Sequence, residues 1–563
     1  MNNLSTAFIA LVLAFCLAPF DADAKSNSKP DKVDVIMVYD AKPDKAEKDR
    51  VKALGAETKR EFENFNMRAI SISENALQHL GNGKGIRFVA KDREIFSTAL
   101  TMLAPAVPGN SAAHKTAGIP ASGSTNASYK GSNVGMAVID SGVGTHQDLA
   151  AGAVQFNFFG GATPSIQAYG DRVKYEADAR SDPLGHGTHV AGILSGSGEG
   201  SSGQHKGLAT SANLISLRVL DGDGRGVTSD AIAALDWLLT YGAYFDVEVI
   251  NMSIGKGVEE SNATDPLVLA VEQVWDSGVV VVVAAGNYGR DGHMTITSPA
   301  NSRKVITVGS LTDSETGDDL SDDYVSTYSS MGPTLGDHVL KPDLVAPGNR
   351  VTATVSYGAK LLGDLPTRIG KCGDSYCSAT YLELSGTSMA APMVAATAAM
   401  MLDKDPSLTP ATIKARLMRS ARKIDAEPTA AGAGVLDIDA ALDETGTVSG
   451  QALSPLMARS DEGPVILVED TAKLWGDATW GSGYLWTDGY LWTDGYLWTD
   501  GYLWTDGYLW TDGYLWTDGY LWTDGYLWTD GYLWTDGYLW TDAVTDYNSL
   551  FETNNQTIGL NDD

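Results

Sequence analysis

Short apolar runs and longer helical patterns alternate through the middle of this chain. Between residues 133 and 442, near-continuous apolar runs such as Val134 to Ile139 and Val279 to Ala285 predict buried strands, because a strand covered on both faces has no polar side. Patterns with helical spacing, for example Ser229 to Thr240, lie between them. This alternation predicts an α/β three-layer sandwich with a mostly parallel central sheet.

A smaller unit with another pattern precedes this region, from Asp31 to about Ser97. Its apolar and polar positions predict strands at 33–38, 68–72 and 86–89, a helix at 44–54, and a short helix at 75–80 capped by Ser73. We therefore expect a compact α+β module. Residues 101–133 are rich in Ala, Gly, Ser and Pro, which indicates a linker or processing region.

The first residues have the organisation of a secretory signal. An apolar run, Ala7 to Phe20, precedes Ala22-Asp23-Ala24, a small-x-small site that suits signal peptidase. The run is shorter than the roughly 20 apolar residues of a membrane-spanning helix. Cys16 raises the alternative of lipid attachment, but Phe15 stands where such a motif has a small residue. We expect cleavage after Ala24, a secreted protein and no membrane span.

A hexapeptide tract occupies residues 484–542. The unit Tyr-Leu-Trp-Thr-Asp-Gly recurs ten times, with Ala543 in place of the last Gly. Four β-prone residues followed by Asp-Gly predict a hairpin, so each unit would form one strand of a meander in which Trp pairs with the next Leu. A parallel solenoid with one unit per coil is the alternative. The tract either binds polysaccharide or a partner surface through its aromatic side chains, or is a low-complexity spacer.

Charge and cysteine content narrow the partners and the setting. The formal net charge is −31, which disfavours nucleic acid and anionic membranes, because both bind chiefly through Lys and Arg. Without the signal, only Cys372 and Cys377 remain, and an even pair in an exported chain predicts a local disulfide. Two free thiols are the alternative. A zinc site is not indicated, since the pair lacks CxxC spacing and an accompanying His.

Four segments carry residues suited to acyl-transfer chemistry. Asp140 ends an apolar strand and can orient an imidazole, and His186 in Gly-His-Gly-Thr-His-Val is the candidate base. Ser388 in Gly-Thr-Ser-Met-Ala-Ala-Pro opens a helix and needs such a base to become a nucleophile. Asn287 follows another buried strand and is a neutral donor suited to an oxyanion. His189 is interpreted as structural.

Together these segments resemble the subtilisin-like serine proteases, and the resemblance covers roughly residues 133–442. It implies a serine endopeptidase in which Asp140, His186 and Ser388 form the catalytic triad and Asn287 completes the oxyanion hole. No cofactor is required for this chemistry. The alternative from another class is a catalytically silent surface binding protein that displays the repeat tract.

The resemblance also assigns a substrate groove for protein or peptide substrates. Two edge segments would pair with an extended substrate by strand addition, and a third segment would line the first specificity pocket. The small pocket walls favour broad specificity, with apolar or aromatic residues before the cleaved bond. The groove residues are Gly224, Arg225, Gly226, Ser253, Ile254, Gly255, Ala284, Ala285 and Gly286.

The early module resembles the inhibitor-type propeptide of this family, a ferredoxin-like unit that blocks the groove. Arg87 to Arg93 resembles its exit strand, and self-cleavage would follow between Ser97 and about Ala121. An accessory domain is the alternative. Structural calcium is common in the family, and Asp148 is the candidate ligand, whereas Asp221-Gly222-Asp223-Gly224 lacks the later oxygens and distal Glu of an EF-hand.

These predictions divide the chain into six parts. They are a signal peptide (1–24), a propeptide (25–110) with its ferredoxin-like inhibitor module (31–97), a catalytic domain (111–448), a linker (449–483), the β-prone repeat tract (484–542) and an acidic tail (543–563).

Overall fold

The structure is a computed structural model. It describes residues 32–97, 111–149, 153–170, 172–314, 316–317, 321–372, 375–377, 379–459 and 465–467, together with six short strands between residues 501 and 544. The predicted signal peptide, Cys16 included, lies outside the described residues. In the described part of the chain, no helix is long and apolar enough to cross a membrane.

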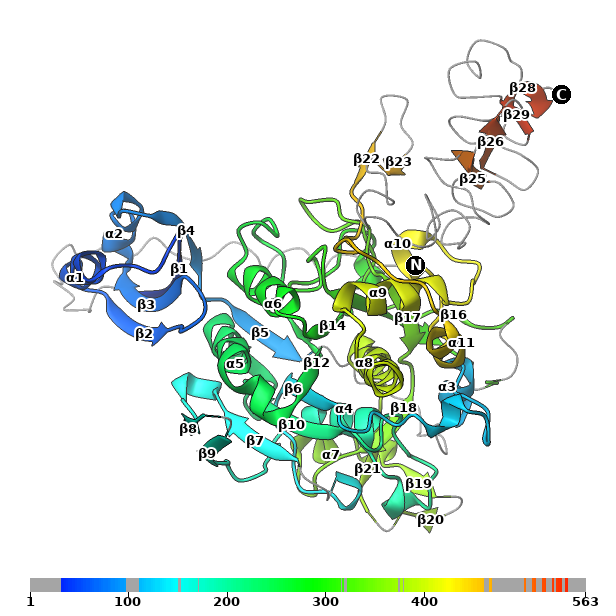
Figure 1. Ribbon diagram of the computed structural model, residues 1–563, viewed down its shortest axis with the longest axis horizontal. Helices are drawn as coiled ribbons and strands as arrows, with labels where there is room; N and C mark the ends of the chain where they lie inside the picture. The colour runs from blue at the N-terminus through cyan, green and yellow to red at the C-terminus, as the bar shows by residue number, and fades with distance from the viewer. Residues whose placement is uncertain are drawn as a thin grey trace, which may run out of the picture.

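A mostly parallel sheet forms the centre of the larger part of the molecule (Figure 1). Its strand order is β16-β15-β14-β12-β6-β10-β7, and β17 also pairs with β15. All these pairings are parallel except that of β16 with β15. The strands are β6 (Gly135–Asp140), β7 (Val154–Asn157), β10 (Asn213–Arg218), β12 (Val247–Met252), β14 (Val280–Ala284), β15 (Ile306–Thr312), β16 (Tyr324–Val325) and β17 (Leu344–Pro347). The predicted α/β architecture is confirmed.

Helices cover both faces of this sheet. Helices α5 (Thr228–Tyr241) and α6 (Pro266–Asp276) pack against each other on one side, and α4 (His186–Ser195) packs against α8 (Thr387–Lys404) on the other (Figure 1). Helix α8 is apolar or small on all sides and nearly all of its residues are buried, as expected for a helix enclosed by other elements. Its first turn therefore lies deep in the molecule.

The N-terminal module, residues 32–97, has the order βαββαβ of a ferredoxin-like fold. Its four strands form an antiparallel sheet in the order β2-β3-β1-β4. The elements are β1 (Lys32–Tyr39), α1 (Lys45–Ala53), β2 (Glu57–Glu61), β3 (Met67–Ser73), α2 (Glu74–Leu77) and β4 (Ile86–Lys91).

The module differs from its prediction in two elements. Strand β2 was absent from the prediction, because an exposed edge strand of sequence Glu-Thr-Lys-Arg-Glu has no apolar alternation. The second helix ends at Leu77 instead of Leu80, and Ser73 occupies the N-cap position without a capping hydrogen bond from its side chain.

Smaller elements complete the larger part of the molecule, which contains the predicted catalytic residues and is called the catalytic body. They are α3 (Ser111–Thr116), the hairpin β8 (Ser165–Tyr169) and β9 (Arg172–Glu176), β18 (Val351–Thr354), α7 (Lys360–Asp364), the hairpin β19 (Lys371–Cys372) and β20 (Ser375–Tyr376), β21 (Tyr381–Leu384), α9 (Pro410–Arg419), α10 (Pro428–Ala431), α11 (Ile438–Asp443), β22 (Met457–Arg459) and β23 (Val465–Leu467).

The described strands of the repeat tract do not follow the predicted meander. Strands β25 (Leu509–Asp512) and β26 (Gly519–Trp522) are antiparallel, and Trp510 faces Leu521. A two-residue turn at Asp512-Gly513 would place Trp510 opposite Leu515 instead. The next pair, β26 with β27 (Thr529–Asp530), is parallel. In this part the prediction of one hairpin per unit is wrong, since a whole unit separates the paired strands.

Candidate active site

The ends of β6 and α4 bring Asp140 and His186 together, and α4 packs against α8, the helix that carries Ser388. Asp140 is the last residue of β6, His186 is the first residue of α4, and Ser388 is the second residue of α8. Nδ1 of His186 lies 2.7 Å from Oδ1 of Asp140, and both side chains are fully buried. The motifs of Asp140 and His186 thus meet at the carboxyl end of a parallel strand, the usual place for functional groups in this fold class.

The contact with Asp140 determines the tautomer of His186. A carboxylate only accepts hydrogen bonds, so Nδ1 carries the proton in the neutral ring and Nε2 has a lone pair. Among the described residues, Nε2 has no hydrogen-bond partner. Burial by itself lowers the pKa of His186, but the negative charge of Asp140 and its hydrogen bond outweigh burial and raise this pKa. The ring is therefore arranged to accept a proton and hold it.

Ser388 is tied to the beginning of strand β13 (Ile254–Gly255). Its hydroxyl donates to the carbonyl oxygen of Ser253 at 3.3 Å, and the hydroxyl of Ser253 donates to the carbonyl oxygen of Ser388 at 3.0 Å. The hydrogen bond from Ser388 to Nε2 of His186 is not formed. Such contacts are often long or misaligned in an enzyme without substrate, so its absence does not exclude the pair.

Asn287 follows β14 and faces the first turn of α8. Its Oδ1 accepts hydrogen bonds from the backbone N–H of Thr387 at 3.0 Å and from the Thr387 hydroxyl at 3.2 Å. These two bonds orient the amide, because only Oδ1 can accept from an N–H and a hydroxyl donor. The NH₂ group of Asn287 is consequently the part of the side chain suited to donate to an anion.

A polar layer behind Asp140 was missed in the sequence. Ser141 donates from its backbone N–H to Oδ1 of Asp140 at 2.7 Å, and its hydroxyl lies 2.8 Å from Oδ1 of Asp182. Asp182 also accepts bonds from the N–H groups of Gly185 and Thr188, both at 2.8 Å. Burial raises the pKa of Asp182. An Asp four residues before a helix-opening His was the available signal, since acceptors commonly precede helix starts.

His189 has the structural role expected for it. It is fully buried, and its Nε2 donates to the carbonyl oxygen of Leu382 at 2.8 Å. Burial lowers the pKa of His189 to about 3. A neutral ring bonded to the backbone ties α4 to β21 and takes no part in the contacts between His186 and Asp140.

The two predicted edge segments of the groove already pair with a strand of the same chain. Strand β5 (Glu94–Ser97) leaves the N-terminal module and enters the larger body (Figure 1). There it lies antiparallel between β11 (Arg225–Val227) and β13. Phe96 faces both Arg225 and Gly255. The expected exit strand, 87–93, is instead mostly β4 of the module, and the groove is filled by the next four residues.

Gly224 permits the close approach of this strand. The backbone N–H of Ser97 donates to the carbonyl oxygen of Gly224 at 3.0 Å, and Gly224 has a φ of +79°. A Cβ at this position would lie 2.7 Å from Oγ of Ser97, closer than van der Waals contact allows. Gly226 faces Ile95, and Ile254 faces Ser97. The predicted groove residues 224–226 and 254–255 thus all contact or flank β5.

The predicted pocket wall lies directly before Asn287. Ala284 ends β14, and Ala285 and Gly286 follow it, all three buried. Gly286 has a φ of +110°, and a Cβ there would lie 2.7 Å from Cγ2 of Thr297. Only glycine fits this turn, which sets the position of Asn287. The role of these residues in a specificity pocket stays a prediction.

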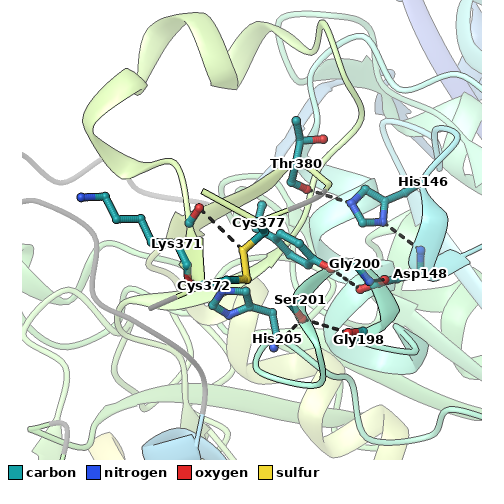
Figure 2. The surroundings of a disulfide bond; sticks show 12 residues. His146, Asp148, Gly198, Gly200, Ser201, His205, Lys371, Cys372, Cys377 and Thr380 are labelled. Carbon is teal, nitrogen blue, oxygen red and sulfur yellow. Dashed lines mark hydrogen bonds between the residues drawn. A yellow bond between two sulfur atoms is a disulfide. The ribbon is translucent and has the colours of Figure 1, made fainter. Parts of the chain in front are cut away.

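The disulfide and the predicted calcium ligand Asp148 lie in the same neighbourhood of the structure (Figure 2). Cys372 and Cys377 are bonded to each other in the structure. Their sulfur atoms and a ring nitrogen of His205 lie within 4.8 Å of one another, a proximity that sequence spacing could not show. In the described residues this is the one His, Cys or carboxylate cluster of metal-binding size, but disulfide sulfurs are not the thiolates that metals require.

Asp148, the predicted calcium ligand, is held by two hydrogen bonds to its carboxylate. Its Oδ1 accepts a hydrogen bond from the N–H of Gly200 at 2.8 Å (Figure 2), and its Oδ2 accepts one from the Tyr381 hydroxyl at 2.8 Å. These contacts tie Asp148 to Gly200 and Tyr381, and its role as a calcium ligand stays a prediction.

Comparison with known proteins decides the family. Residues 131–437 match the family model described as "Peptidase_S8: Subtilase family". The chain belongs to the subtilase family. Family membership makes the protein a serine endopeptidase that needs no cofactor for catalysis, and its substrates are peptides or proteins.

Individual subtilases match different lengths of the chain. Serine protease AprX of Bacillus subtilis (strain 168) is 37% identical over 315 residues, which are 55% of this chain and 66% of AprX. Subtilisin E of the same organism is 29% identical over 418 residues, which are 73% of this chain and 91% of subtilisin E. The match to subtilisin E extends beyond the 307 residues of the family model, so it includes sequence outside the catalytic match.

A solved structure supports the fold. The crystal structure of fervidolysin from Fervidobacterium pennivorans, described as a keratinolytic enzyme related to subtilisin, matches with a TM-score of 0.56 and 21% identity. The match covers 78% of this chain and 68% of fervidolysin. At this identity it shows a shared fold alone.

Proposed function

We propose that this subtilase cleaves internal peptide bonds through Ser388, His186 and Asp140. Ser388 Oγ attacks the peptide carbonyl while Nε2 of His186 removes its proton and then returns it to the leaving amine. Asp140 holds the tautomer and stabilises the imidazolium. Water hydrolyses the acyl-enzyme by the same route. The observation that carries the proposal is the 2.7 Å contact between Nδ1 of His186 and Oδ1 of Asp140, both buried.

Asn287 is the proposed side-chain donor to the oxyanion. Its Oδ1 is engaged by Thr387, so the NH₂ group can donate where negative charge develops. The backbone N–H of Ser388, in the first turn of α8, is the second proposed donor. Donors already in place stabilise the transition state without reorganisation.

The N-terminal module is the proposed inhibitor of its own chain. Strand β5 pairs with both edge segments, so no substrate strand can add to either. The module also docks through a buried ion pair, Arg60 with Asp230 at 2.6 Å, and through the N–H groups of Glu63 and Asn64, which donate to the Asp236 carboxylate. We propose that the enzyme is made as a zymogen and acts after this strand leaves.

Processing is proposed between Ser97 and Ser111. Strand β5 ends at Ser97 beside β13, and the residues from Ser111 onward belong to the catalytic body. Ala113 and Ala117 are buried in its core, and the N–H of Ile438 donates to the carbonyl of Ala117. Cleavage after Ser111 would cut a packed segment. This range is narrower than the one expected from sequence, which reached Ala121.

The remaining features concern location and specificity. The signal peptide predicted at residues 1–24 favours export, so we propose a secreted protein that acts outside the cell. Small residues at Ala284, Ala285 and Gly286 support broad specificity with apolar or aromatic residues before the cut.

We also retain the proposal that the repeat tract binds polysaccharide or a surface partner. Deleting residues 484–542 should then lower binding to insoluble matrix and leave hydrolysis of soluble casein unchanged.

Expression of the wild type and of Ser388→Ala tests the proposal. The wild type should react with a fluorophosphonate probe and yield a mature N-terminus between residues 98 and 111. Ser388→Ala should take no label and keep the module attached, while Ser277→Ala, at the end of α6, should behave as wild type. A wild-type protein that takes no label and stays unprocessed would refute the peptidase proposal and favour the silent binding protein.

A further inference from the structure

An acidic pair on the catalytic body binds the residue that precedes the groove-filling strand. Arg93 lies one position before β5. Its Nη1 lies 2.7 Å from Oε1 of Glu259, and its Nη2 and Nε lie 2.9 Å and 3.1 Å from Oε1 of Glu260. One guanidinium therefore bridges two carboxylates. Such multidentate contacts fix the position of a guanidinium as well as its charge.

Arg93 supplies the cation nearest to Glu260. Glu260 is 17% exposed, and its other neighbour, Lys256 Nζ at 3.5 Å, is bonded more closely to Asp265 at 2.5 Å. With Arg93 present, two cations face the three carboxylates of Glu259, Glu260 and Asp265. Without Arg93, Glu260 keeps only the 3.5 Å contact with Lys256 Nζ, and a partly buried carboxylate is costly to leave poorly paired.

These acidic residues belong to the catalytic body and stay when the module leaves. Glu259 and Glu260 lie in the loop between β13 and α6. Lys256 pairs through its backbone with Ser298, and Asp265 caps α6 by accepting from the N–H of Leu267 at 2.9 Å. The loop is thus anchored at both ends. A preformed site costs little entropy when a ligand binds.

We infer that Glu259 and Glu260 form an extended subsite that selects substrates with a basic residue at one position. That position lies three residues before the substrate residue that faces Gly255. In the chain's own segment Phe96 faces Gly255 and Arg93 occupies this position. The ligand class is an extended peptide with Arg, or with Lys as a poorer fit because it lacks the planar fork. The inference rests on the proposed peptidase function, whose groove it extends.

The next position of the substrate strand should be nearly indifferent to charge. Glu94 contacts Arg225 at 2.6 Å, but these side chains are 52% and 63% exposed. Exposed ion pairs contribute little, because water and salt screen them and two long side chains lose freedom. The exposed ion pair of Glu94 with Arg225 is therefore the control for the less exposed ion pair of Arg93 with Glu260.

Peptide kinetics with the processed enzyme test the inference. Blocked peptides with the sequence of residues 91–101 are prepared with Arg, Lys, Gln or Glu at the Arg93 position, and a further peptide carries Gln at the Glu94 position. We expect kcat/KM for the Arg peptide to exceed that of the Gln peptide about tenfold, with Glu lower still. The advantage should shrink as salt is added. The Glu94→Gln peptide should stay within about twofold of its parent.

Variants of the enzyme test whether Glu259 and Glu260 cause the preference for the Arg peptide. Glu259→Gln/Glu260→Gln should reduce the preference for Arg over Gln to within about twofold and leave kcat/KM for the Gln peptide unchanged. Glu176→Gln, an exposed acid on β9, should keep the preference. If the double variant does not fold, Glu260→Gln alone, whose side chain is 17% exposed, should reduce the preference several-fold.

Three outcomes would each overturn a claim. Equal kcat/KM for all residues at the Arg93 position, with all peptides cleaved, overturns the subsite and leaves the peptidase intact. No cleavage of any peptide, together with no fluorophosphonate label, refutes the peptidase and the subsite with it. A preference that survives in Glu259→Gln/Glu260→Gln shows that other groups create it and also overturns the assignment.

Discussion

Nδ1 of His186 and Oδ1 of Asp140 are 2.7 Å apart, and neither side chain is exposed. Burial alone lowers the pKa of His186, while the charge of Asp140 raises it, and the net direction is upward from 6.5. A general base must be neutral to accept a proton. Activity should therefore rise with pH through a midpoint above 6.5 and fall as the ring becomes protonated at lower pH.

Replacing Asp140 tests whether its charge outweighs burial in setting the pKa of His186. Asp140→Asn should lower kcat by about 10³–10⁴-fold, because the amide no longer fixes the tautomer. In this variant burial still lowers the pKa of His186, but the carboxylate charge that raised this pKa is gone. The midpoint of kcat/KM against pH should therefore move to lower pH. The pH profiles of wild type and variant check both effects. A midpoint that stays in place would mean that Asp140 does not control the charge of His186.

Asn287 should contribute to the transition state and little to substrate binding. Asn287→Ala should lower kcat by about 10²–10³-fold with a small change in KM, the range for loss of one oxyanion donor. Steady-state kinetics on a soluble peptide make the measurement. Thr387→Ser keeps the hydroxyl that bonds Oδ1 of Asn287 and should retain most of the activity. A rise in KM at constant kcat would place Asn287 in substrate binding instead.

The Arg60 guanidinium should hold the N-terminal module on the catalytic body. Its Nη2 lies 2.6 Å from Oδ1 of Asp230, and both side chains are buried. Removing one partner of a buried pair costs about 3–5 kcal/mol. In a chain that carries Ser388→Ala, Arg60→Ala should therefore speed hydrogen exchange in β5 and β11.

A surface pair of the same module is the control for this change. Lys48 and Glu61 are 2.7 Å apart and substantially exposed, so Lys48→Ala should cost at most about 1 kcal/mol. Mass spectrometry of peptides that cover residues 93–97 and 225–227 reports both variants. Equal exchange in Arg60→Ala and Lys48→Ala would show that the buried pair does not hold the module.

The Cys372–Cys377 disulfide should stabilise its hairpin and leave catalysis intact. The bond closes a loop with a sequence separation of five, for which the loop-entropy model gives about 2 kcal/mol. Cys372→Ser/Cys377→Ser should lower the free energy of unfolding by that amount and leave kcat/KM within about twofold. Urea unfolding and peptide kinetics check the two expectations. A large loss of activity at unchanged stability would contradict them.

Local sequence patterns were sufficient to predict the main architecture and the residues proposed to be catalytic. Continuous apolar runs such as Val280–Ala284 become central parallel strands because burial on both faces selects such sequences. The motifs around Asp140, His186 and Ser388 are contiguous, so their residue types and order are readable without coordinates. Strand β2 was missed because its side chains are charged and no apolar period marks it.

Contacts between distant segments were decided only in the tertiary structure. Arg60 pairs with Asp230 across 170 positions, and His205 reaches the disulfide from a loop far from Cys372. Nothing in either local sequence encodes its partner, because the partner is chosen by how separate elements pack. The same holds for Glu94–Ser97 between β11 and β13, and for Arg93 on Glu259 and Glu260. The sequence by itself determined which residues have the chemistry; packing decided which of them meet and which segment fills the groove.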